Sequence, residues 1–86
     1  MEEKAGIFEQ LSSMIDQLCH LKKQVKVLFD EDPEKYRQTF NEITKLSKSI
    51  RDFIQEKKVP QQLTPDEIRE LQDKLDQNNI RDIVIR

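Results

Sequence analysis

An apolar seam at heptad spacing runs through the first third of the chain. Apolar residues recur at steps of four and three: Ile7, Leu11, Met14, Leu18, Leu21, Val25 and Leu28. This spacing keeps one side of an α-helix apolar over three heptads, as in a helix that packs lengthwise against another. The seam predicts a helix over about residues 3–29.

A second apolar seam follows an acidic break, Asp30-Glu31-Asp32-Pro33-Glu34. Asp32 is typical of a helix N-cap, and Pro33 suits the first helical position. The new seam again steps by four and three: Tyr36, Phe40, Ile43, Ser47, Ile50 and Ile54. It predicts a helix over about residues 33–57 that ends before Pro60.

The two predicted helices are antiparallel neighbours, because the break between them is short. Pairing their seams places Val25 beside Tyr36 and Leu21 beside Phe40, with the centre of the hairpin near Glu31. A centre within the break favours a hairpin over a parallel coiled coil.

A third, shorter helix is predicted over about residues 65–77. Thr64-Pro65-Asp66-Glu67 has the sequence of a capping box, and Ile68, Leu71 and Leu75 share one face of the helix that follows. The Ile-rich C-terminal segment, residues 80–86, fits a short helix, a strand or disorder. The predicted fold is therefore all-α, a two-helix hairpin with a shorter third helix in one domain over residues 1–86.

Composition and charge exclude several classes of function. Charged residues make up 37% of the chain, acids and bases alternate, and the net charge of −2 argues against nucleic-acid binding. No apolar run approaches the roughly 20 residues of a membrane span. A lone cysteine, Cys19, and the absence of a signal-peptide pattern favour a cytoplasmic protein.

We expect no catalytic, cofactor or metal site. Cys19 and His20 are the only residues of their types, and adjacent helical side chains point about 100° apart. With Gly6 as the single glycine, a glycine-rich phosphate loop is excluded.

Basic residues gather on both long helices: Lys22, Lys23, Lys26, Lys45, Lys48 and Arg51. The nearby acids favour a solvated helix face, and an acidic partner or phosphate is the alternative.

Apolar residues beside the seams leave two flanks of the hairpin to be covered. Phe8, Ile15 and Phe29 lie on one flank, and Leu46 and Phe53 lie on the other. One short third helix can cover one flank, and exposed apolar patches tend to mark interaction sites. The sequence predicts a protein-binding module, such as an adaptor, regulatory subunit or small chaperone. Its candidate partner-binding residues are Phe8, Ile15, Phe29, Leu46, Phe53, Ile80, Ile83 and Ile85.

Two alternatives use the same surface. The first is a homo-oligomer, in which two hairpins form a dimeric helical bundle. The second comes from Asp32-Pro33-Glu34-Lys35-Tyr36 followed by Phe40, which resembles the opening of the second helix in small helical-hairpin chaperones of type III secretion systems. That resemblance covers about half of the chain and implies a chaperone of secreted substrates, while the third helix and Ile-rich segment depart from the simplest members.

Overall fold

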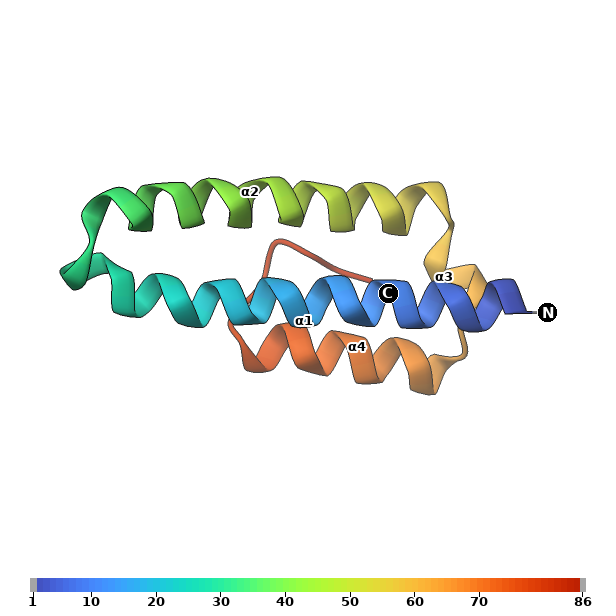
Figure 1. Ribbon diagram of the computed structural model, residues 1–86. Helices are drawn as coiled ribbons and strands as arrows, with labels where there is room; N and C mark the ends of the chain where they lie inside the picture. The colour runs from blue at the N-terminus through green and yellow to red at the C-terminus, as the bar shows by residue number, and fades with distance from the viewer. Residues whose placement is uncertain (1, 86) are drawn as a thin grey trace.

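The two long helices form an antiparallel hairpin. A computed structural model describes residues 2–85, with side chains described for residues 6–85 (Figure 1). Helix α1 spans Glu2–Glu31 and helix α2 spans Pro33–Glu56, side by side along most of their length. The all-α hairpin is therefore confirmed. Within the described residues, no helix has the length and apolar character needed to cross a bilayer.

The chain reverses at a single residue, Asp32. Its side chain accepts a hydrogen bond from the Lys35 backbone N–H at 3.1 Å and so caps α2. Pro33 stands in the first turn of α2, where its missing N–H leaves no helical bond unmade. Asp30 and Glu31, expected in the turn, continue α1 instead.

The third predicted helix is α4, Pro65–Gln77, and it begins at the predicted capping box. Thr64 Oγ1 accepts a hydrogen bond from the Glu67 backbone N–H at 3.2 Å, and Glu67 Oε1 accepts one from the Thr64 backbone N–H at 2.9 Å. These two bonds satisfy backbone donors that the first turn of a helix leaves unpaired.

A one-turn helix, α3 (Val59–Gln62), connects α2 to α4 and was not anticipated from the sequence. It follows Lys58, whose φ of 49° lies in the left-handed region and redirects the chain. Pro60 lies after the end of α2, as predicted, and also in the first turn of α3. Proline is favoured at the start of a helix, so both positions are compatible with it.

Helix α4 packs against α1 on one side of the hairpin (Figure 1). Leu71 and Leu75 of α4 are fully buried, as are Leu11, Ile15 and Leu18 of α1. These side chains belong to one apolar core cluster, so α4 supplies a third layer to the hairpin.

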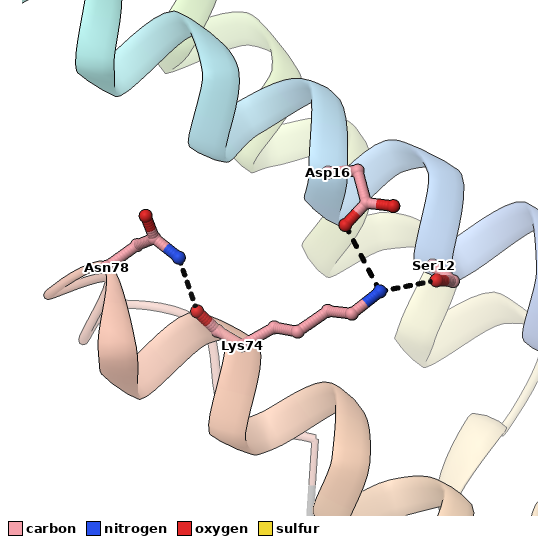
Figure 2. A network of polar contacts seen from close by, with 4 residues as sticks. All are labelled: Ser12, Asp16, Lys74 and Asn78. Carbon is pink, nitrogen blue, oxygen red and sulfur yellow. Dashed lines mark hydrogen bonds and ion pairs between the residues drawn. The ribbon is translucent and has the colours of Figure 1, made fainter.

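A polar network lies at the edge of this contact (Figure 2). Lys74 Nζ donates to Ser12 Oγ at 2.9 Å and pairs with Asp16 Oδ1 at 3.1 Å, and Asn78 Nδ2 donates to the Lys74 carbonyl at 2.8 Å. Because the Asp16 side chain is 63% exposed, solvent weakens the ion pair. The network therefore contributes more to the orientation of α4 than to stability.

Residues 80–85 form neither helix nor strand, and their three isoleucine side chains lie in the core, whereas Val84 is exposed. Figure 1 shows this segment turning back from the end of α4 along the gap between α1 and α2. Ile80, Ile83 and Ile85 are only 2%, 0% and 1% exposed. These three residues were predicted to bind a partner, but they are core residues and do not form an exposed surface. They fill the space that α4 leaves beside α2.

Polar contacts hold this segment in place. Gln72, itself buried, accepts a hydrogen bond from the Ile85 backbone N–H at 2.9 Å and donates one to the Ile83 carbonyl at 3.5 Å. Asp82 pairs with Arg51 of α2 at 2.9 Å. Because Gln72 satisfies the Ile85 N–H and the Ile83 carbonyl, this end of the segment can be buried without a strand partner.

Candidate functional site

One of the two predicted flanks of the hairpin is covered. Ile15 has no exposed surface, and Phe8 is half-buried and packs against the core. α4 covers this flank because Leu71 and Leu75 pack there with Ile15. Ile15 is therefore a core residue rather than a partner-binding one, and Phe8 offers only part of its surface.

The other flank carries Leu46 and Phe53, which are half-buried and pack against the core. Gln10 and Gln17 on α1 are exposed and do not cover this flank. Leu46 and Phe53 consequently form a shallow apolar strip rather than a set of prominent anchors.

Three aromatic rings gather at the turn end of the hairpin, and we call Phe29, Tyr36 and Phe40 the distal aromatic row. Phe29 packs edge-on against Tyr36, with ring centroids 5.2 Å apart and ring planes at 82°. Phe40 lies 6.2 Å from Tyr36 at an interplanar angle of 32°. Phe29 is 63% exposed and Phe40 is 51% exposed. Two large exposed apolar side chains are thus joined through a third ring.

Of the predicted partner-binding residues, Phe29 is the one that is mainly exposed. Phe40 was predicted to lie in the apolar seam between the two helices, but about half of its side chain is exposed. The sequence predicts Val25 as the neighbour of Tyr36, whereas the structure places Phe29 there, four residues later along α1. The difference arises because the reversal between the helices was predicted near Glu31 and lies at Asp32. Phe40 is exposed because the elements outside the hairpin, α4 and residues 80–85, end before they reach it. α4 has 13 residues against 30 in α1, so the third layer ends before the turn. A comparison of predicted helix lengths could have revealed this.

A hollow of about 260 Å³ continues the distal aromatic row toward residues 80–85. Ser47, a small residue at a seam position, is buried and lines the hollow, where a larger side chain would occupy part of the space. The hollow is lined by Leu18, Lys22, Phe40, Ile43, Thr44, Ser47, Arg51, Ile80 and Asp82. It is therefore apolar toward the core and has charged groups at its rim.

Cys19 is half-buried on α1, and its environment favours the neutral thiol. Burial raises the pKa of the Cys19 thiol, and the nearby Asp16 carboxylate raises it further. Lysines act in the opposite direction without reversing the shift: Lys23, Lys74 and Lys22. Because the thiolate is the reactive form, this environment is unlike that of a nucleophilic cysteine.

We expect Cys19 to react with iodoacetamide several-fold more slowly than N-acetylcysteine at pH 8, as followed by mass spectrometry. The raised pKa also means that the unfolded chain releases the thiol proton first as the pH rises. The free energy of unfolding should therefore fall as the pH rises from the ordinary thiol pKa to the raised pKa of Cys19. Denaturing the chain should restore the reaction rate of a free cysteine. A native rate equal to that of N-acetylcysteine would contradict the effect of burial.

Comparisons with protein-family models, with curated proteins and with solved structures found no match. Among the described residues, no group of three or more His, Cys, Asp or Glu side chains is placed to hold a metal ion. The distal aromatic row and its adjoining hollow are thus the features from which a function can be inferred.

Proposed function

We propose that this chain is a protein-binding module that docks a partner on the distal aromatic row. The observation that carries the proposal is the exposure of Phe29 and Phe40 by more than half, side by side through Tyr36. Aromatic side chains are enriched at protein interfaces, and a few central ones commonly supply most of the binding energy. An adaptor, a regulatory subunit and a small chaperone would each use such a surface.

The exposed surfaces of Phe29 and Phe40 are not explained by the stability of the fold. Leu11, Leu18 and Ile50 are fully buried in the basal part of the hairpin, where α4 and residues 80–85 complete the core. Phe29 and Phe40 lie beyond this core, so most of their surface contributes nothing to the stability of the chain. Neighbouring exposed apolar groups are unusual on a soluble monomer unless a partner covers them.

The proposal is tested by capture with the tagged full chain as bait, comparing wild type with the double variant Phe29→Ala/Phe40→Ala. We expect the double variant to bind the captured partner about 30-fold or more weakly, since central aromatic residues cost about 2 kcal/mol or more when truncated. Helicity should be retained. The free energy of unfolding should fall by about 1–3 kcal/mol, because both rings lose their contacts with Tyr36.

Val27→Ala is the matched control for capture. Val27 is 58% exposed on the same helix, and two residues of helix place it about 200° around α1 from Phe29. It should leave capture unchanged. Equal capture by wild type and the Phe29/Phe40 variant would refute the proposal. If sedimentation equilibrium instead shows a wild-type dimer that the double variant abolishes, the docked partner is a second copy of the chain.

A further inference from the structure

The third layer of the molecule stops short of the turn end of the hairpin. At about 1.5 Å per residue, the 30 residues of α1 extend about 45 Å and the 13 residues of α4 about 20 Å. Figure 1 shows the turn end projecting beyond both α4 and residues 80–85. The distal aromatic row lies in this uncovered part.

The uncovered part offers a lengthwise groove between two antiparallel helices. We define the distal groove as the distal aromatic row together with the hollow beside Phe40. From Tyr36 to Ser47, α2 lines it over about three helical turns, or about 16 Å. Amphipathic helices bind in such grooves through side chains spaced three and four residues apart. α4 packs on α1 alone, outside this groove, but uses the same spacing, with Leu71 and Leu75 buried four residues apart.

The charge along α1 changes between the base and the turn end. At the base, Asp16 faces Lys74 of α4 (Figure 2). Between Asp16 and Asp30, α1 carries no acid and three lysines: Lys22, Lys23 and Lys26. At the turn the charges are mixed, because Arg37 of α2 and the acids Asp30 and Glu34 all lie within one turn of the distal aromatic row, so the basic edge is the part that holds Lys22 and Lys26. A helix docked beside Lys22 and Lys26 therefore needs acids along that edge, where α4 has a lysine.

We infer that the distal groove takes an amphipathic helix of a partner protein, about three turns long, with acidic side chains along its edges. Such a helix would cover the gap between α1 and α2 at the turn end, as residues 80–85 do at the base (Figure 1). The inference rests on the docking role proposed above and adds the chemistry of the partner. The net charge of the chain is −2, so a preference for an acidic helix must come from the local lysines.

Two synthetic helical peptides of about three turns test this inference. Both carry the same leucine face, and both are held helical by the same side-chain cross-link on the face that points away from the groove. The positions at the edges of the leucine face are all Glu in one peptide and all Lys in the other. Each is titrated at low ionic strength into the isotope-labelled full chain. We expect the Glu-edged peptide to bind at least about tenfold more tightly, to shift the amide signals of Phe29 and Phe40, and to lose its advantage as salt is added.

Charge reversal on α1 should reverse the preference. Lys22→Glu/Lys26→Glu is expected to bind the Lys-edged peptide more tightly. Lys57→Glu/Arg69→Glu changes the net charge equally, at exposed positions outside the distal groove, and should bind like wild type. Equal binding of both peptides through Phe29 and Phe40 would overturn the acidic-edge inference and leave the docking proposal standing. Binding of neither peptide would overturn the helical partner, while capture with the Phe29/Phe40 variant decides the docking role separately.

Discussion

Ile83→Ala is expected to lower the free energy of unfolding by about 2–5 kcal/mol, because it empties a fully buried site. Ile83 has no exposed surface and belongs to the core cluster that includes Leu18, Ile50 and Leu71. The loss is a large fraction of the total for a small domain, whose stability is typically about 5–15 kcal/mol. Urea denaturation followed by far-UV circular dichroism measures the change.

The neighbouring residue gives the control for this variant. Val84 is 60% exposed, so Val84→Ala should change the free energy of unfolding by no more than about 0.5 kcal/mol. A small and equal effect of both substitutions would mean that residues 80–85 are not part of the core. Ile80, Ile83 and Ile85 would then again be available to a partner.

The three longer helices could be predicted because their signals are local. The expected third helix, residues 65–77, has the observed bounds of α4, since a capping box joins backbone and side chains three residues apart. The expected second helix, residues 33–57, ends one residue from the observed α2. In each case a periodic apolar face and a recognisable start signal lie within the same segment.

The path of residues 80–85 could not be predicted, because it depends on contacts distant in sequence. Ile80, Ile83 and Ile85 are spaced by three and then two residues, which matches neither the helical nor the strand period. Their burial depends on Gln72, a residue outside the segment, which bonds the Ile85 backbone N–H and the Ile83 carbonyl. Apolar composition alone does not distinguish a core residue from an exposed partner-binding one.

The exposure of Phe40 was missed for a related reason. A heptad seam predicts which face of a helix is apolar, but burial of that face depends on what covers it. Ile50 and Phe40 both occupy seam positions, and Ile50 is fully buried whereas Phe40 is 51% exposed. The difference comes from where α4 and residues 80–85 end along the hairpin. The candidate site is therefore a consequence of unequal helix lengths.

Gln72→Leu is expected to destabilise the chain by about 1–3 kcal/mol, although leucine has a similar size and is apolar. Gln72 is 6% exposed, and its Oε1 accepts the Ile85 backbone N–H at 2.9 Å while its Nε2 lies 3.5 Å from the Ile83 carbonyl. Leucine would leave the buried Ile85 N–H without this partner. The Arg51–Asp82 pair cannot compensate, since both of its side chains are well exposed and solvent weakens it.

Hydrogen exchange separates this effect from a general loss of packing. In the wild type, the Ile85 amide should be protected, and in Gln72→Leu it should exchange much faster than the amides in the middle of α1, because residues 80–85 can detach while the hairpin remains folded. Gln77→Leu, at an exposed position on the same helix, should change neither stability nor exchange. If the Ile85 amide stayed protected in Gln72→Leu, the segment would be held by its isoleucines alone, and the role assigned to Gln72 would be wrong.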